Sequence, residues 1–307
     1  MTRRIGSDEI SGAVFLRDVV RALRPLQWAK NLLLFVPLAL TPHAVGDQAR
    51  QLAVLLAFVC FSLCASAGYV LNDLLDLRAD RQHPTKRHRP FASGALPIPL
   101  GIALIALLLA LGLGLGFLST APSFLSVLGV YLGVSVAYSV FLKRQLLIDV
   151  IVLAGLYTLR VIAGAAAVSI ALTPWLLAFS LFIFLSLAFV KRYSELALTA
   201  ARQEERLPRR AYQVGDLDLV LILGSSSGYL SVLVLCLYIN SDLVGQLYQT
   251  VEMLWLLCPI LLYWIGRIWF LAKRGELLGD PVAFAVRDPI SYLLGLLAVA
   301  VLAAAVL

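Results

Sequence analysis

The stretch QLAVLLAFVCFSLCASAGYVLNDLLDLRAD, residues 51–80, joins a long apolar run to a set of regularly spaced acidic residues. Its first part, residues 51–71, has no charged side chain and is long enough to cross a bilayer as a helix, which takes about 20 residues. Such runs recur along the whole 307-residue chain, which is 61% hydrophobic and 14% charged, against roughly 25% charged residues in soluble domains. The sequence therefore predicts an all-α, polytopic membrane protein that folds as one domain, residues 1–307.

Nine apolar segments are predicted to cross the membrane, separated by short connections that contain turn-forming residues. The predicted spans are 28–45, 50–71, 98–119, 122–141, 146–171, 174–192, 217–240, 250–272 and 288–307. Before them, residues 1–27 carry Arg17, Arg21 and Arg24 among apolar residues, a pattern typical of an amphipathic helix on the membrane surface. The four cysteines lie inside predicted spans without metal-ligand spacing, so we interpret them as packing residues.

The basic residues are concentrated on one side of the predicted topology. All but two of the 25 Lys and Arg residues, Arg50 and Arg160, fall in the N-terminal segment, in the even-numbered connections or at the span ends next to them. Because cytoplasmic loops are enriched in Lys and Arg, we expect these segments to face the cytoplasm, in an inner or plasma membrane. The net charge of +7 then reflects this asymmetry and attraction to anionic lipid, so the bilayer is an expected partner and nucleic acid is not. The sequence does not decide whether the protein forms a homo-oligomer.

Four polar residues mark the predicted cytoplasmic end of the second span. If the helix continues there, Asn72, Asp76 and Asp80 repeat every four residues on one face, with Asp73 beside them. Carboxylates stacked at a membrane boundary are costly unless a cation is bound. Mg²⁺ prefers carboxylate and amide oxygens and keeps room for phosphate, so all four residues are candidate Mg²⁺ ligands. The three aspartates are also the candidate catalytic residues.

Basic residues follow directly in HPTKRHRPFASG, residues 83–94. Lys86, Arg87 and Arg89 are suited to bind phosphate oxygens. Acidic residues for a metal beside basic residues for phosphate indicate a site for a magnesium diphosphate. The alternative is a solvated loop that obeys the positive-inside rule, which explains the basic residues but leaves the regular spacing of the acidic ones unexplained.

The pattern ND-x-x-D-x-x-x-D followed by HPTKRHRPFASG resembles the first signature of the UbiA superfamily of intramembrane prenyltransferases. The hydrophobic layout is similar to that of the family over essentially the whole chain. The resemblance implies a ring of nine helices around a central cavity that opens near the cytoplasmic face and laterally to lipid. It also implies Mg²⁺-dependent transfer, usually from a polyprenyl diphosphate to an aromatic acceptor such as 4-hydroxybenzoate.

The second signature of that family departs from its usual form in this chain. Its members carry a second aspartate motif in the sixth-to-seventh helix region, which holds a second Mg²⁺. Here the sequence is FVKRYSELA, residues 189–197, with Lys191, Arg192 and Glu195 where paired aspartates are expected. The departure argues against a two-metal site for a prenyl diphosphate.

Three stretches resemble one branch of the family, the decaprenyl-phosphate phosphoribosyltransferases. They are LRPLQWAKNLLLFVPL at 23–38, KRYSEL at 191–196 and GDPVAFAVRDPIS at 279–291. The resemblance implies Mg²⁺-dependent transfer of 5-phosphoribose from phosphoribosyl diphosphate (PRPP) to a polyprenyl phosphate, with release of diphosphate. The lipid phosphate is already an anion, so this reaction needs no general base, in agreement with the lack of an obvious histidine–acid pair.

Further residues are candidate contacts for substrate phosphate groups. Lys191 and Arg192 are predicted to bind the 5-phosphate of PRPP, and Lys30 and Arg144 to meet the lipid phosphate. Arg160 lies inside the fifth span, where a charged residue usually faces a cavity or a partner, and it shares roughly one helix face with Asp149 and Tyr157. The alternative for Arg160 is a structural ion pair. Tyr138 is a candidate to hydrogen-bond phosphate, with ring packing as the alternative. For Asp280, Arg287 and Asp288, a place in the site and a place in a solvated loop are equal alternatives.

Two other functions remain as alternatives to phosphoribosyl transfer. Prenyl transfer to an aromatic acceptor within the same family differs in the donor consumed and in the expected residues at 189–197. A transporter is expected to show inverted repeats and broken helices that meet at the membrane midplane, whereas the charge here collects on one side. The length of the isoprenoid chain does not follow from the sequence.

Overall fold

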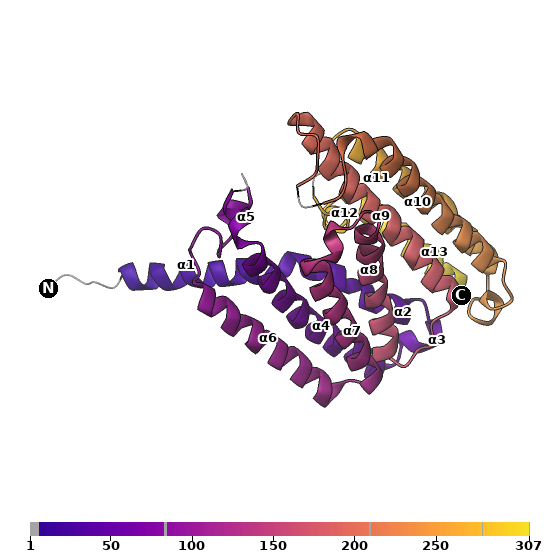
Figure 1. Cartoon of the computed structure of the whole chain (residues 1–307). Coiled ribbons are helices and arrows are strands. Elements are labelled where there is room, and N and C mark those ends of the chain that lie inside the picture. Colours follow the sequence, from indigo (N-terminus) through magenta and orange to yellow (C-terminus); the bar gives the residue numbers. More distant parts are fainter. Residues whose placement is uncertain (1–5, 83–84, 209, 278, 307) are drawn as a thin grey trace.

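A computed structural model describes residues 6–82, 85–208, 210–277 and 279–306, and within these ranges the chain forms helices and no strand (Figure 1). The elements in chain order are α1 Gly6–Leu23, the 3₁₀-helix η1 Pro25–Phe35, α2 Val36–Ala39, α3 Pro42–Val45, α4 Gln48–Leu75, α5 Leu77–Gln82, η2 Lys86–His88, α6 Ile98–Ser119, α7 Pro122–Val140, η3 Leu142–Arg144, α8 Ile148–Ala167, α9 Pro174–Ala201, η4 Val214–Asp216, α10 Leu217–Ile239, η5 Val244–Gln246, η6 Val251–Leu256, α11 Leu257–Lys273, α12 Pro281–Ala285 and α13 Pro289–Val306. The predicted all-α class is confirmed.

Eight helical segments of the described chain are long and apolar enough to cross a membrane, one fewer than predicted. They are Gln48–Leu75, Ile98–Leu118, Pro122–Val140, Ile148–Ala167, Pro174–Ala201, Val214–Ile239, Val251–Lys273 and Pro289–Val306. The prediction of a long helix over 28–45 is wrong, because this stretch is divided into η1, α2 and α3. Pro37 and Pro42 each lie in the first turn of a new short helix, where the missing N–H of proline is tolerated.

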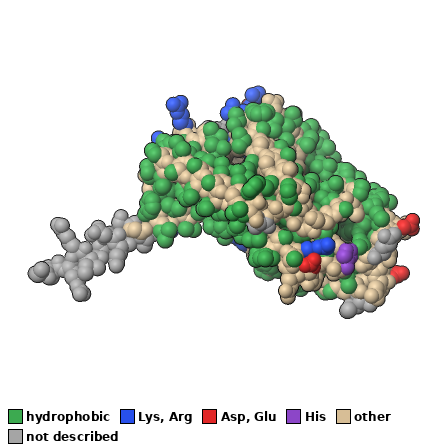
Figure 2. All heavy atoms as spheres, turned by 90° about the horizontal axis from the view of Figure 1, so that it is seen from below, with side chains coloured by type: hydrophobic (Ala, Val, Ile, Leu, Met, Phe, Trp, Pro, Cys, Tyr) green, Lys and Arg blue, Asp and Glu red, His purple; other side chains and the backbone are tan. Residues whose placement is uncertain are grey.

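The long helices pack mainly on their neighbours in the chain, and η1 lies between α4 and α8. The approach of η1 to α8 depends on Gly164, because a Cβ added there would lie 2.0 Å from the carbonyl oxygen of Leu34. The two larger clusters of buried residues lie around α9, α10 and α11 and around α4, α7 and α8, and a small third one includes Ala22, Val70, Phe91 and Leu96. The space-filling view shows a mostly hydrophobic surface, as expected for a protein surrounded by lipid (Figure 2).

Helix α1 extends away from the bundle at the N-terminal end of the chain (Figure 1). Its apolar side chains Val14, Phe15, Leu16 and Val20 are exposed. An exposed apolar surface on a helix that also carries arginines is consistent with the predicted position on the membrane surface, which stays a prediction.

Candidate active site

One face of α4 holds the N-terminal half of η1 in place. Asn31 donates a hydrogen bond to Ser62 at 2.9 Å, and the indole N–H of Trp28 donates to Ser66, also at 2.9 Å. Farther along the same helix, Arg24 reaches the carboxylate at position 73. Because these three contacts fix the segment from Arg24 to Asn31 against α4, residues distant in sequence are brought to one end of the bundle.

Asp73, Asp76 and Asp80 form the acidic cluster, in which Arg89 bridges two of the carboxylates and Arg24 binds one of them. Nη1 of Arg89 lies 3.0 Å from Oδ1 of Asp73 and 2.6 Å from Oδ2 of Asp80, and Arg24 also donates to Oδ1 of Asp73. The side chains of Asp73 and Asp80 are only 2% and 5% exposed. The first signature thus folds back on itself, with its own arginine placed between two of its aspartates.

The prediction that the acidic residues share one continuous helix face is wrong, because α4 ends at Leu75 and α5 begins at Leu77. In an unbroken helix Asp73 and Asp80 would lie about two turns apart, with about 10 Å of rise along the axis. The break lies at Asp76, with ψ near 5°, and the carboxylates on either side of it share one Arg89 nitrogen. Asp76 itself accepts from Nζ of Lys143 at 3.1 Å, and Asn72 precedes Asp73 in α4, half-buried.

The other predicted phosphate ligands of this connection lie near its surface. Lys86 is exposed and interacts electrostatically with the acidic cluster and with Glu195 of α9. Arg87 is exposed, and its Nε lies 3.4 Å from a ring nitrogen of His88. The structure therefore brings Lys86 to the acidic cluster and directs Arg87 elsewhere.

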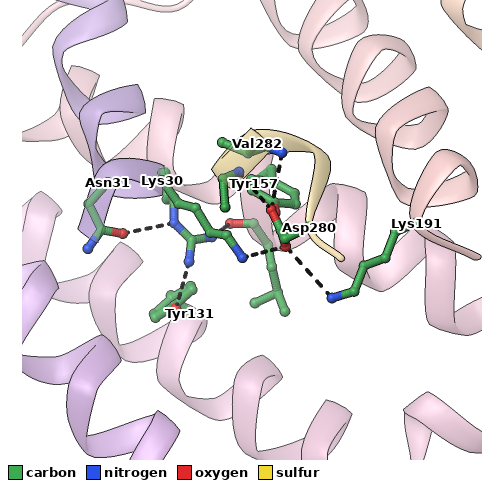
Figure 3. A network of polar contacts seen from close by, with 10 residues as sticks. Lys30, Asn31, Tyr131, Tyr157, Lys191, Asp280 and Val282 are labelled. Carbon is green, nitrogen blue, oxygen red and sulfur yellow. Dashed lines mark hydrogen bonds and ion pairs between the residues drawn. The ribbon is translucent and has the colours of Figure 1, made fainter. Parts of the chain in front are cut away.

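Lys30, Lys191, Tyr157 and Asp280 form a second group, the lysine centre (Figure 3). Nζ of Lys30 lies 2.5 Å and Nζ of Lys191 3.7 Å from Oδ2 of Asp280, and the hydroxyl of Tyr157 donates to the same oxygen at 3.2 Å. Burial raises the pKa of Asp280, but the charges of Lys30 and Lys191 outweigh it and hold this pKa well below its ordinary value. The single carboxylate is therefore ionised, and two cations share it.

Arg160 is buried beside the lysine centre, with its guanidinium carbon 5.4 Å from the ring centroid of Tyr157. Its guanidinium donates to Asn31 at 3.0 Å, to the hydroxyl of Tyr131 at 3.0 Å and to the carbonyl of Leu156 at 2.6 Å. The rings of Tyr131 and Phe61 lie against it, 4.9 and 5.5 Å from the guanidinium carbon. Among the described residues no ion pair includes Arg160, and its charge is balanced by these dipoles and ring faces together with the electrostatic effect of Asp280.

The two adjacent cations of α9 face different surroundings, because successive side chains on a helix diverge by about 100°. Lys191 lies in the lysine centre, whereas Arg192 is fully buried, with its Nε 2.8 Å from Asp149. Arg192 also contacts Glu195, and the hydroxyl of Tyr212 donates to Asp149 at 2.9 Å. The structure thus does not bring Arg192 together with Lys191, and the partner of Asp149 is Arg192 rather than Arg160.

Other predicted residues lie apart from both groups. Arg144 is exposed, and Tyr138 lies under the guanidinium of Arg210, 5.6 Å from the ring centroid. Asp288 accepts two hydrogen bonds from Arg267, at 2.7 and 2.9 Å. Asp280 and Asp288, which the sequence does not distinguish, are therefore separated by the structure, and only Asp280 joins the lysine centre.

Tyr69 connects the acidic cluster and the lysine centre. Its ring lies beneath the guanidinium of Arg24, which binds Asp73, with 5.7 Å between guanidinium carbon and ring centroid. It also interacts electrostatically with Asp280 and Arg160. The two groups thus belong to one polar region rather than to two separate sites.

Sequence reasoning missed Lys143, Tyr69 and the role of Arg24 in this region. Tyr69 lies one helical turn before Asp73, so helical spacing alone marks it as a neighbour of the acidic cluster. Lys143 is adjacent to Arg144, which was chosen in its place. For Arg24 no local signal exists, because its partner Asp73 is 49 residues away.

A largely apolar cavity of about 720 Å³ lies near the lysine centre, lined by residues of η1, α8, α9, α10 and α11. Val161 and Leu187 line it one helical turn from Tyr157 and Lys191. Phe184 also lines it and stacks on Tyr157, with ring centroids 5.3 Å apart. The cavity is large and apolar enough to receive part of a hydrocarbon chain, and its nearest wall lies one helical turn from the lysine centre.

The acidic cluster offers the ligand types that Mg²⁺ prefers. Within the described residues no three Asp, Glu, His or Cys side chains group closely enough to hold a metal ion by themselves. Asp73 and Asp80, however, both lie within 3.0 Å of one Arg89 nitrogen, so one small group can contact both carboxylates. Mg²⁺ usually combines one or two carboxylates with water and substrate phosphate, and the cluster fits a cation bound in this shared way.

Comparison with solved structures supports the same fold. A UbiA homologue from Archaeoglobus fulgidus, solved with DMAPP and Mg²⁺, superposes with a TM-score of 0.68 at 18% identity, over 92% of this chain and 98% of that one. At this identity the likeness concerns the fold, and it confirms the predicted helical architecture.

Comparison with known sequences places the chain in a family. The decaprenyl-phosphate phosphoribosyltransferase of Mycobacterium tuberculosis is 36% identical over 303 residues, 96% of each chain. An uncharacterised protein of Sinorhizobium fredii, y4nM, is 37% identical over 92% of this chain, which spans 54% of that protein's length. A model of the UbiA prenyltransferase family matches residues 32–287. The resemblance seen in the first signature is thereby confirmed, and the chain belongs to the UbiA prenyltransferase family.

Proposed function

We propose that the protein transfers 5-phosphoribose from PRPP to a polyprenyl phosphate, with Mg²⁺ and with release of diphosphate. The observation that carries the proposal is the lysine centre, in which Lys30 and Lys191 share the carboxylate of Asp280. PRPP carries a 5-phosphate as well as its diphosphate, and the polyprenyl phosphate carries a phosphate monoester of its own. A second cationic group next to the acidic cluster, one helical turn from the wall of an apolar cavity, is suited to such substrates.

The acidic cluster is proposed to hold the diphosphate end of the donor. Asp73, Asp76 and Asp80, with the amide of Asn72, would bind Mg²⁺, which neutralises diphosphate charge when bound. The cations that now neutralise the carboxylates, Arg24, Arg89 and Lys143, can turn to the diphosphate oxygens. The exposed Lys86 would add a further contact.

In the proposed reaction an oxygen of the lipid phosphate forms a bond to C1 of the ribose while the bond from C1 to diphosphate breaks. The attacking oxygen is already deprotonated, so the site needs only to orient both substrates and to stabilise developing charge. The nearby carboxylates can stabilise positive charge at C1, and the Arg and Lys side chains can stabilise the departing diphosphate. Arg160 and Arg192 are fixed by protein partners, and we assign them to positioning.

Prenyl transfer is the second candidate function. The Archaeoglobus homologue was solved with the prenyl diphosphate DMAPP, and its fold is shared. The similarity to the mycobacterial phosphoribosyltransferase over nearly the whole of both chains favours phosphoribosyl transfer.

The site is proposed to face the cytoplasm of the cell membrane. The connections around both polar groups carry most of the Lys and Arg residues, as the positive-inside rule requires. Labelling of Glu205→Cys, in a chain without other cysteines, by an impermeant reagent added outside intact cells would contradict this orientation.

Protection against thermal unfolding tests the choice of donor. PRPP with Mg²⁺ is expected to raise the Tm of the purified protein in detergent, because ligand at about 100 times Kd adds about 2.7 kcal/mol to the free energy of unfolding. PRPP with EDTA is expected to give much less protection. If geranyl diphosphate protects with Mg²⁺ and PRPP does not, the prenyl-transfer alternative replaces the proposal.

A further inference from the structure

The lysine centre carries more positive charge than its own residues neutralise. Lys30 and Asp280 are each 11% exposed, and Lys191 is 24% exposed, so water screens this group poorly. One carboxylate faces two ammonium groups, and the charge of Arg160 also acts on Lys30. Uncompensated charge at such a buried position is costly, which indicates that a further anion belongs there.

The donors around Asp280 have the arrangement of a phosphate site. Two ammonium groups and the hydroxyl of Tyr157 converge on its single oxygen Oδ2. The other oxygen, Oδ1, accepts from the backbone N–H groups of Val282 and Ala283 at 3.1 and 3.2 Å, which caps α12 (Figure 3). Oδ2 therefore stands where a phosphate oxygen would satisfy the same three donors, and a phosphate dianion would balance the two lysines.

The neighbouring cavity decides between the two phosphate monoesters of the proposed reaction. Its apolar wall begins one helical turn from Tyr157 and Lys191, at Val161 and Leu187. The 5-phosphate of PRPP is attached to a polar ribose, whereas the phosphate of a polyprenyl phosphate is attached directly to hydrocarbon. An anion bound at the lysine centre with its substituent in this cavity therefore matches the lipid.

We propose that Lys30, Lys191 and Tyr157 form the phosphate-monoester site for the acceptor lipid, and that Asp280 occupies it when no substrate is bound. The assignment rests on the proposed function, since a lipid phosphate is the acceptor only in that reaction. It gives Asp280 the role of an internal competitor, which keeps two buried lysines neutralised and yields to the substrate.

Binding of geranyl phosphate, a short lipid phosphate, tests the site without any donor or turnover. Lys191→Met is expected to weaken this binding by about ten- to a hundredfold, as for loss of one charge-assisted hydrogen bond. Asp280→Asn is expected to strengthen it by roughly tenfold, because asparagine retains the cap of α12 but no longer competes for the lysines. The Lys30→Met/Asp280→Asn double variant removes a lysine without leaving Asp280 as an unpaired carboxylate, and it is expected to bind geranyl phosphate weakly. Lys273→Met, an exposed lysine at the end of α11, is the matched control and is expected to bind normally.

Ribose 5-phosphate and PRPP with Mg²⁺ serve as the second arm, and their binding is expected to change little in these variants. If they lose affinity while geranyl phosphate does not, the centre binds the donor's 5-phosphate and the lipid assignment is overturned. If no ligand responds to Lys191→Met or Asp280→Asn, the centre is not a phosphate site. Binding of geranyl phosphate is measured without PRPP. A failure of the lipid-phosphate site is therefore distinguishable from a failure of PRPP to act as donor.

Discussion

Asp76→Asn is expected to lower turnover by about a hundred- to a thousandfold, the range seen when one preorganised charge-stabilising group is removed. Asp76 lies at the break between α4 and α5, and the substitution removes the charge that Lys143 neutralises and that Mg²⁺ would require. The side chain of Asp76 is 20% exposed and that of Lys143 is 7% exposed, and the fold is expected to persist because the amide oxygen of asparagine can still accept a hydrogen bond from Lys143. The measurement is turnover with saturating Mg²⁺ together with Tm in detergent.

Asp47→Asn provides the control at the other end of the same helix. Asp47 caps the start of α4 through the backbone N–H groups of Ala49 and Arg50, a role that asparagine fills equally well. Turnover near the wild-type level is expected for this variant. Full activity of Asp76→Asn, or full activity of the wild type in EDTA, would remove the acidic cluster from the mechanism.

Arg192→Met is expected to lower the free energy of unfolding by about 3–5 kcal/mol, as for the loss of one partner of a buried ion pair. Arg192 and Asp149 are both inaccessible to solvent, and the substitution leaves the carboxylate buried without its countercharge. The neighbouring Lys191→Met removes a partly exposed cation and is expected to leave Tm nearly unchanged while weakening lipid-phosphate binding.

The Arg192→Met/Asp149→Asn double variant separates a structural role from a role in substrate binding. It removes the pair as a unit and is expected to regain most of the lost stability, because asparagine still accepts from Tyr212. If Arg192→Met instead keeps its Tm and loses affinity for PRPP, Arg192 contacts substrate as its place in the sequence indicates.

The fold could be predicted largely from the apolar runs, because a helix that crosses lipid needs a length of hydrophobic sequence that few other structures require. The stretch 28–45 is less apolar than the other predicted spans, with Lys30, Asn31 and His43 in it, and it is interrupted by Pro37 and Pro42. Each proline lies in the first turn of a new short helix, so hydropathy identified the segment but not its shape.

The site could be predicted only where its residues are close in sequence. Asp73, Asp76 and Asp80 were recognised from their spacing, although the break in the helix changes how they are brought together. Their partners Arg24 and Lys143 come from other elements, and only the packing of η1, α4 and η3 shows the contacts. The sequence could not predict that Lys191 and Arg192 have different partners, because the surroundings of each side chain depend on the rotation of α9 within the bundle.

Transfer of label from PRPP into lipid is the measurement that tests the proposed function most directly. The purified protein in detergent with Mg²⁺ receives either PRPP labelled in the ribose together with polyprenyl phosphate, or labelled geranyl diphosphate together with 4-hydroxybenzoate. We expect labelled lipid and free diphosphate from the first pair, no product from the second, and neither product from Asp76→Asn. Prenylated 4-hydroxybenzoate without any label entering lipid from PRPP would contradict the account and establish prenyl transfer in its place.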